Sequence, residues 1–367
     1  MKVVFYWGGP GNMHPQTGNP YARLLIEALA QYGVDLEVPE SLNLWRQVWR
    51  RDIGGLHFGW VNGHYAGGDH WYTVAAQALS FAVALVLARL RGLRIVWTVH
   101  NLYPHEQPYP WVDRVVRLLV CAVAHAVIVH CHRAGELVAE HFGRRDDVYV
   151  IPHGQFIDPY PNTISQQEAR KALGLSPESF VYVFFGNIRP YKGIETLFDA
   201  FTSLDDPSAR LVIAGKLHRS YGGTLPGSAN QDPRVLLLAK PEGEGIPADE
   251  VQVYLNAGDV VVLPFLDTLT SGSAILSLGF GKPVIAPAVG CLPELLQDHG
   301  CGIVYQPGND QALRDALSQA RALNLEVAGQ RARQRARSLD WDDIARRTMV
   351  AYGLDSPLEA RSASSNG

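Results

Sequence analysis

The sequence predicts an α/β protein made of two doubly wound, Rossmann-like domains. Three observations lead to this prediction. The chain has 367 residues, a length that suggests two domains. Short runs rich in valine and isoleucine alternate with longer helical patterns. Most of these runs are continuously apolar, which is typical of parallel strands that helices cover on both faces.

The predicted strands fall into two series, and each series predicts one parallel sheet. The first series covers residues 2–7, 35–38, 55–58, 94–100, 126–130 and 148–152. The second covers residues 180–186, 210–215, 235–238, 260–264, 283–286 and 302–305. Ligands of such sheets bind beyond the carboxyl ends of the strands, so the loops at those ends are the candidate functional segments.

A polar segment with two prolines, residues 158–162, interrupts the periodicity between the two series. We therefore predict one domain over residues 1–160 and a second over residues 161–340. A helix over residues 341–353 is expected to cross back to the first domain. Residues 354–367 contain Ser, Ala and Pro and are predicted to be a disordered tail.

The composition excludes several classes of function. Hydrophobic residues make up 47% of the chain and the net charge is −4, so a folded core is expected and nucleic acid is not an expected partner. The four cysteines match no common zinc spacing, and no cofactor or metal is expected. Met1 and Lys2 lead directly into the first strand without a signal-peptide pattern, so we expect a cytoplasmic protein.

Two apolar runs, residues 74–90 and 115–129, are shorter than the roughly 20 apolar residues that a membrane span needs. We expect both to form buried helices. Arg89, Arg91 and Arg94 cluster beside the first run, which leaves open a peripheral contact with the inner face of a membrane.

The segment from Gly186 to Gly193 leaves an apolar strand through a glycine turn and precedes a helix. Arg189 and Lys192 place two cations three residues apart in this turn. Arg supplies a bidentate fork and Lys a point charge, and the two together suit a diphosphate. An ordinary solvated loop is the alternative interpretation.

A second candidate segment consists of Thr270, Ser271, Gly272 and Ser273, which follow a strand and open another helix. One hydroxyl at this place is explained by helix capping. Three hydroxyls around a glycine suggest in addition a site for an anion at the helix N-terminus.

Polar residues collect at the predicted strand ends of the first domain, where they are candidates for general bases. These candidates are Asp69, His70, His100 and Glu106. The loop after the first strand, residues 8–21, does not have the spacing of a dinucleotide-binding motif. It is expected either to line the same cleft or to be a flexible loop.

In combination and order, several segments resemble the GT-B glycosyltransferases of family 4. They are Phe-Gly-Asn-Ile-Arg-Pro-Tyr-Lys-Gly (185–193), Leu-Val-Ile-Ala-Gly-Lys (211–216), Ala-Gly-Asp-Val-Val-Val-Leu-Pro (257–264), Gly-Lys-Pro-Val-Ile-Ala (281–286), Gly-Cys-Leu-Pro-Glu (290–294), Val-His-Asn (99–101) and Val-Ile-Pro-His-Gly (150–154). The resemblance extends to about residue 352. It implies two domains facing a central cleft, with the acceptor on the N-terminal side and a nucleotide sugar on the C-terminal side.

The resemblance also implies roles for individual residues. Arg189 and Lys192 would bind the donor diphosphate next to Gly186, and residues 270–273 would meet the phosphates or the sugar. Lys240 and Glu242 would lie near the nucleotide base, and His100 would face the transferred sugar.

One departure concerns two glutamates, eight positions apart, that retaining members carry. The corresponding positions here are Thr268 and Leu276. In this respect the chain is similar to exopolysaccharide-type transferases that lack the pair, some of which invert configuration. The resemblance therefore leaves open whether this chain retains or inverts.

The expected activity is metal-independent transfer of a hexose from a nucleotide diphosphate sugar, with a UDP-sugar favoured, to a hydroxyl of a glycan or a lipid-linked glycan. The expected setting is the synthesis of exopolysaccharide or envelope glycan. A GDP-mannose-dependent mannosyltransferase and a hydrolysing nucleotide-sugar epimerase are alternatives. A two-lobed solute-binding protein would fit the architecture but should carry an export signal. The missing glutamates also leave a catalytically inactive scaffold as a rival.

Overall fold

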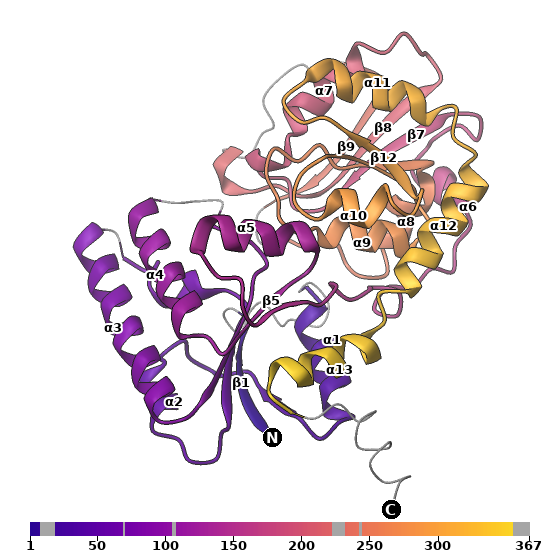
Figure 1. Cartoon of the computed structure of the whole chain (residues 1–367). Coiled ribbons are helices and arrows are strands. Elements are labelled where there is room, and N and C mark those ends of the chain that lie inside the picture. The colour runs from indigo at the N-terminus through magenta and orange to yellow at the C-terminus, as the bar shows by residue number, and fades with distance from the viewer. Residues whose placement is uncertain (8–18, 69, 105–107, 222–231, 242–243, 355–367) are drawn as a thin grey trace, which may run out of the picture. The chain divides into compact units, whose positions relative to one another are not determined.

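The computed structural model describes residues 1–7, 19–68, 70–104, 108–221, 232–241 and 244–354 (Figure 1). These residues form two compact units. Unit 1 contains residues 1–154 and the segment that begins at Asp340, and unit 2 contains residues 155–339. The predicted disordered tail lies outside the described residues, except for residue 354.

Unit 1 is built on a six-stranded parallel sheet with the order β2-β1-β3-β4-β5-β6. Its strands are β1 (Lys2–Tyr6), β2 (Asp35–Glu37), β3 (Gly55–Phe58), β4 (Arg94–Thr98), β5 (Ala126–Val129) and β6 (Val148–Val150). Its helices are α1 (Tyr21–Ala30), α2 (Trp45–Val48), α3 (Trp71–Leu90), α4 (Pro110–Val123), α5 (His132–Phe142) and α13 (Trp341–Ala351). The interior strands β3 and β5 are buried at every position, and the continuously apolar sequence of β5 predicts this.

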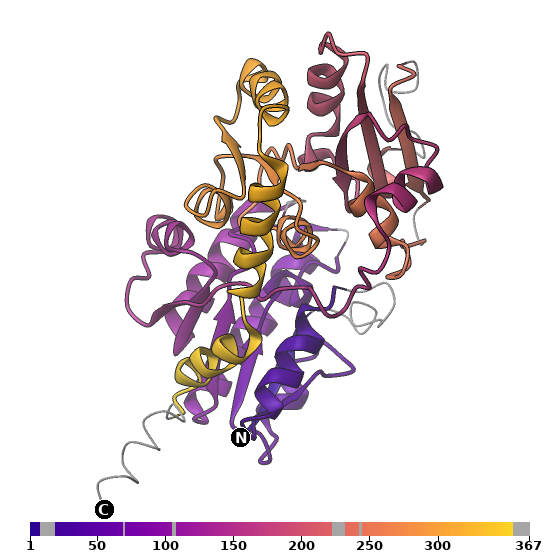
Figure 2. The ribbon, with the colours of Figure 1, turned by 90° about the vertical axis from the view of Figure 1, so that its right-hand side faces the viewer.

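Helices cover both faces of this sheet (Figure 1). Helices α3, α4 and α5 each connect neighbouring parallel strands, and right-handed crossovers place all three on one face. Helices α1 and α13 pack against each other on the other face, although they lie at opposite ends of the chain (Figure 2).

The end of α13 is anchored in the sheet by hydrogen bonds. The Tyr352 hydroxyl lies 2.7 Å from Nδ1 of the buried His57, whose Nε2 lies 2.7 Å from Thr98 Oγ1. Arg94 donates from Nε and Nη2 to the carbonyl of Ala351, at 3.2 and 3.0 Å. The C-terminal helix is therefore part of the core of unit 1.

Unit 2 is built on a second six-stranded parallel sheet, with the order β12-β11-β10-β7-β8-β9. Its strands are β7 (Phe180–Phe185), β8 (Ala209–Lys216), β9 (Val235–Lys240), β10 (Val260–Val262), β11 (Val284–Pro287) and β12 (Gly302–Tyr305). Its helices are α6 (Gln166–Ala172), α7 (Ile194–Thr202), α8 (Val251–Ala257), α9 (Gly272–Gly279), α10 (Leu292–Leu296), α11 (Asp310–Ala320) and α12 (Leu325–Arg337). The strand order reverses between β7 and β10, and this reversal is the place where doubly wound sheets bind ligands.

The prediction of two parallel, doubly wound sheets is confirmed, and each of the twelve predicted strands is present. The differences are at strand ends. The predicted strand over residues 260–264 stops at Val262, and the one over residues 94–100 stops at Thr98. In both cases the apolar sequence continues into the loop after the ladder of backbone hydrogen bonds has ended.

The expectation that the two apolar runs form buried helices is wrong for part of their surface. The first run lies in α3, which has 20 residues because it begins at Trp71 rather than at Val74. Among the described residues, α3 is the one helix that is long and apolar enough to span a membrane. A single helix of this kind is weak evidence for a membrane span, because core helices of soluble proteins meet the same criteria. Its inner side packs on the sheet through residues such as Phe81, which contacts Phe58, whereas its outer side is exposed.

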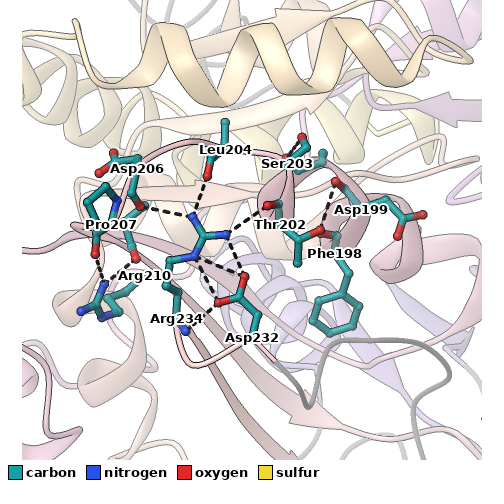
Figure 3. Close-up of polar contacts among 12 residues, drawn as sticks. Phe198, Asp199, Thr202, Ser203, Leu204, Asp206, Pro207, Arg210, Asp232 and Arg234 are labelled. Atoms are coloured by element: carbon teal, nitrogen blue, oxygen red, sulfur yellow. Dashed lines mark hydrogen bonds and ion pairs between the residues drawn. The ribbon is translucent and has the colours of Figure 1, made fainter.

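Arg234, which immediately precedes the edge strand β9, ties the end of α7 to the sheet (Figure 3). Its Nη1 donates to the carbonyl of Leu204 at 2.7 Å, and its Nη2 donates to the carbonyl of Thr202 at 3.1 Å and to the Asp232 carboxylate at 2.7 Å. The hydrogen bond from Arg234 lowers the pKa of Asp232. The guanidinium thus meets carbonyls at a helix C-terminus, where a cation is stabilising.

We predict that Arg234→Met lowers the free energy of unfolding of unit 2 by about 2 kcal/mol, because it removes several hydrogen bonds to a charged donor. The measurement is urea denaturation. Arg234→Lys, the matched control, keeps the charge but not the fork, and its loss should be smaller. Since the pKa of Asp232 is lowered on folding, the ion pair stabilises at neutral pH, and this contribution should begin to decrease below about pH 4 and be lost as the pH falls through the lowered folded-state pKa. Equal denaturation midpoints for Arg234→Met and wild type would contradict the assignment.

Candidate functional site

The two candidate segments of unit 2 meet beyond the carboxyl ends of β7 and β10. Gly186 follows β7 and has a φ of +140°, a backbone conformation that residues other than glycine rarely adopt. A Cβ at Gly186 would lie 2.9 Å from Ser273 Oγ, and one at Gly215 would lie 1.7 Å from the Gly186 carbonyl oxygen. The turn after β7 therefore touches the first turn of α9 and the end of β8 at the same time.

Gly193 closes the other end of the turn. It has φ +66°, and a Cβ there would lie 2.1 Å from the carbonyl oxygen of Pro264. Next to it, the backbone N–H of Leu266 donates to the carbonyl of Tyr191 at 2.8 Å. The loop after β10 is therefore fastened to the turn after β7.

Lys192 lies in the 3₁₀ turn Pro190–Lys192, with its Nζ 3.8 Å from the centroid of the Phe265 ring and 5.2 Å from that of Tyr191. Burial against these rings and, to a lesser extent, the nearby positive charge of Arg189 together lower its pKa to about 7. Near neutral pH this lysine is therefore poised between its charged and neutral forms, and a bound anion would favour the charged form.

The N-terminus of α9 is the third part of this site. Ser271 caps the helix by accepting a hydrogen bond from the backbone N–H of Ala274 at 3.1 Å. Thr268 Oγ1 donates to the carbonyl of Thr270 at 2.8 Å, which stiffens the loop before the helix. The positive end of the helix dipole thus lies beside Gly186, and this geometry suits a phosphate.

The remaining predicted donor-site residues extend the site toward the edge of the sheet. Lys240 ends β9, in register with Lys216 at the end of β8. Lys216 was not among the predicted site residues, although its place at a strand end beside Lys240 is a signal that the sequence carries. Glu242 lies outside the described residues. Thr268 and Leu276, at the positions of the glutamate pair, are both buried.

In unit 1, three histidines from the ends of neighbouring strands form a buried cluster. His100 follows β4, His130 follows β5 and His153 follows β6. Nε2 of His130 lies 3.2 Å from Nδ1 of His100, and the rings of His130 and His153 are 5.3 Å apart. Of the predicted base candidates, His100 belongs to this cluster, and the structure adds His130 and His153 to it.

Burial keeps the imidazoles of this cluster neutral at physiological pH. It lowers the pKa of His130 to about 4, that of His153 to about 3 and that of His100 well below its usual value. A neutral imidazole can accept a proton, so the cluster keeps the chemistry of a base, although burial makes it a weak one. His70 lies apart from the cluster, exposed at the N-cap of α3, and Asp69 and Glu106 lie outside the described residues.

Aromatic rings that the sequence did not single out surround His100. Trp60 stacks on its ring at 5.6 Å, and Trp7 and Tyr21 meet it edge to face at 4.9 and 5.0 Å. Trp60 also lines a small pocket together with Asn62, Asn101 and other residues. Trp7 and Trp60 follow the neighbouring strands β1 and β3, and Tyr21 begins α1, so the three rings meet where these strands end and this helix starts. No group of three or more potential metal-binding side chains occurs within the described part of the chain.

Comparisons with known proteins agree with this architecture. Residues 179–322 match the family model described as "Glycosyl transferases group 1", and residues 70–155 match "Glycosyltransferase Family 4". The GDP-mannose:glycolipid 4-beta-D-mannosyltransferase of Xanthomonas campestris pv. campestris is 28% identical over 315 residues, which are 83% of this chain and 80% of that protein. The D-inositol 3-phosphate glycosyltransferase of Actinosynnema mirum is 30% identical over 73% of this chain and 68% of its own length.

Solved structures show the same fold. The structure of Anabaena Alr3699/HepE in complex with UDP has a TM-score of 0.72 at 17% identity, over 96% of this chain and all of that chain. Sucrose-phosphate synthase from Thermosynechococcus elongatus has a TM-score of 0.68 at 19% identity, over 96% of this chain and 98% of that one. The chain therefore belongs to the GT-B glycosyltransferases, in the group described by glycosyl transferases group 1 and glycosyltransferase family 4.

Proposed function

We propose that this glycosyltransferase moves a hexose from a nucleoside diphosphate sugar to a hydroxyl of a lipid-linked glycan, in the synthesis of exopolysaccharide or envelope glycan. The observation that carries the proposal is the convergence of the Gly186 turn, Lys192 and the N-terminus of α9 at the switch point of unit 2. Backbone N–H groups, a helix dipole and a lysine at one place suit a diphosphate.

In this proposal unit 2 binds the donor. Arg189 and Lys192 offset the charge that develops on the leaving diphosphate, and Thr270, Ser271, Gly272 and Ser273 hold its oxygens or the sugar. Lys240 and Glu242 lie toward the nucleotide base. Because two cations and a helix N-terminus supply the electrostatic stabilisation, we expect no metal ion to be required.

We favour GDP-mannose as the donor. The relative from Xanthomonas campestris, which matches four fifths of this chain, is named for GDP-mannose and a glycolipid acceptor. A UDP-hexose is the second candidate, because the HepE structures of the same fold are titled as complexes with UDP and UDP-glucose. The proposed lipid-linked acceptor places the reaction at the inner face of a membrane.

We further propose that the reaction inverts the anomeric configuration. Thr268 and Leu276 offer no carboxylate at the positions of the glutamate pair, and the Xanthomonas relative is named for a β-linkage. An inverting transfer needs a base that removes the proton of the acceptor hydroxyl. The candidates are Asp69, His70, His100 and Glu106 in unit 1, the unit that we propose selects the acceptor.

The first prediction from the proposed function concerns the donor and the acceptor. GDP should raise the melting temperature more than UDP, ADP or TDP, because a ligand that binds only the folded protein stabilises it. Incubation with GDP-mannose and a polyprenyl-diphosphate glycan should yield a mannosylated lipid, with the same rate after exhaustive chelation. If UDP stabilises the protein more than GDP does and glucose is transferred, the donor is a UDP-hexose and not GDP-mannose. Release of nucleotide without any glycosylated product would contradict transfer, and loss of activity that manganese restores would contradict metal independence.

The second prediction is that donor binding depends on pH through the protonation of Lys192. Its pKa is about 7 in the free protein, and the bound diphosphate should raise that value because it stabilises the ammonium. Affinity should therefore be highest at and below pH 7 and should fall as the pH rises to 9, by at most about tenfold per pH unit, with uptake of a proton on binding. Calorimetry with GDP-mannose in buffers of different ionisation enthalpy measures both effects.

Two variants test this assignment. Lys192→Ala should weaken donor binding by about 1.5–3 kcal/mol, the range for a hydrogen bond to a charged group. Lys192→Arg, the matched control, stays charged at every pH and should give an affinity that does not change between pH 7 and 9. If the affinity of the wild-type protein is also constant between pH 7 and 9, Lys192 does not contact the diphosphate.

The third prediction identifies the base. We expect one of Asp69→Asn, His70→Gln, His100→Gln and Glu106→Gln to lower kcat by roughly 10²–10⁴-fold while donor affinity is unchanged. His141→Asn, on the exposed last turn of α5, is the control. NMR of the product should show inversion at the anomeric carbon. Near-native turnover in all four variants, together with a retained anomer, would refute the base assignment.

A further inference from the structure

The outer surface of α3 is an apolar stripe. Leu79, Val83, Val86 and Leu90 follow one another at intervals of four, three and four residues, which places them on one face of the helix. All four are exposed, Leu79 by 66% and Leu90 by 77%. Single exposed apolar residues are common on proteins, but a continuous row is not.

Helix α4 repeats this pattern. Trp111, Val115, Leu118 and Ala122 have the same spacing and are all exposed. The two helices pack against each other on the same face of the sheet (Figure 1). Arg89 near the end of α3 donates to the carbonyl of Val123 at the end of α4, at 3.0 Å, so the helices run parallel with their C-termini together. We call the combined surface of these eight residues the α3–α4 face.

The exposed charged side chains of α3 and α4 are all positive. Helices α3 and α4 are fully described, and their exposed charged residues are Arg89 and Arg114, while Asp113 is buried beside Arg117. Arg91 follows α3 and covers the exposed Trp49, at 4.8 Å from its ring. Arg46 of the neighbouring α2 is also exposed.

Aromatic residues complete the pattern. Trp71 and Tyr72 are exposed at the start of α3, and Trp111 is exposed at the start of α4. Exposed tryptophans and tyrosines beside arginines and aliphatic residues are typical of helices that lie in the interface of a bilayer.

We propose that the α3–α4 face docks on a bilayer that contains anionic lipid. The apolar rows would enter the region between headgroups and acyl chains, and the arginines would meet lipid phosphates. The helices would lie in the plane of the surface and not across it, because Phe81 and the rest of the inner side of α3 pack on the sheet. A second copy of this chain fits the face less well, since apposed faces would bring arginine against arginine without an exposed carboxylate on α3 or α4. This inference is independent of the identity of donor and acceptor.

The test uses the full chain and vesicles of phosphatidylcholine, either alone or mixed with phosphatidylglycerol. Cosedimentation should show binding to the anionic vesicles that weakens as salt is raised, and much less binding to phosphatidylcholine. Brominated acyl chains should quench tryptophan fluorescence, and this quenching should decrease in the Trp71→Phe/Trp111→Phe variant. These results would support an interfacial position of the face.

Substitutions on the α3–α4 face and a matched control test whether this face is the surface that binds the vesicles. Val83→Glu combined with Val115→Glu should weaken binding to anionic vesicles at least tenfold, and Arg114→Glu should weaken it several-fold. Val350→Glu is the control, because Val350 has nearly the same exposure as Val83, 41% against 42%, but lies on α13 on the opposite face of the sheet. An unchanged far-ultraviolet circular dichroism spectrum and melting temperature would show that each variant is folded.

Three outcomes would overturn the proposal. The first is failure of the wild-type chain to bind anionic vesicles, and the second is binding that Val83→Glu/Val115→Glu leaves unchanged. The third is a dimer in lipid-free sedimentation velocity that the same double variant dissociates, which would assign the face to a second copy.

Discussion

The candidate donor site depends on one steric constraint, which is that three loops of unit 2 approach one another more closely than side chains would allow. Gly186, Gly193 and Gly215 lie at the contacts, where an added Cβ would lie 2.9 Å or less from a neighbouring oxygen. This closeness brings Lys192 against Phe265 and places the N-terminus of α9 beside the turn after β7. The electrostatics of the site therefore follow from backbone packing at the switch point of the sheet.

Burial disfavours the charged form of basic side chains in both units, but with different results. In unit 2 it lowers the pKa of Lys192 to near neutrality, so this cation is only partly charged until an anion arrives. In unit 1 it holds His100, His130 and His153 in their neutral forms. An anion site and a set of proton acceptors thus result from the same physical effect, acting on a base of high pKa and on bases of moderate pKa.

Much of the fold could be predicted from the sequence because a parallel strand buried on both faces has an unmistakable pattern. Val181, Val183 and their neighbours in β7 are apolar without interruption, and the strand follows. The turn residues Gly186 and Gly193 were predictable for a similar reason, since positive φ strongly favours glycine. The cage of Trp7, Tyr21 and Trp60 around His100 was not predictable, because it depends on the order of the strands. The exposed side of α3 was missed because an apolar run does not reveal which of its residues face a sheet.

The bond between His57 and Tyr352 joins residues 295 positions apart, and it has a consequence for the order in which the chain can fold during synthesis. Unit 2 is a continuous segment, so its sheet can be completed as soon as residue 339 has left the ribosome. Unit 1 is begun first but needs α13, which is translated only after unit 2. Until then the ring of His57 lacks the Tyr352 hydroxyl, and Gly154 lacks the Trp341 ring against which it packs. The half of the protein that is made first is therefore the half that is finished last.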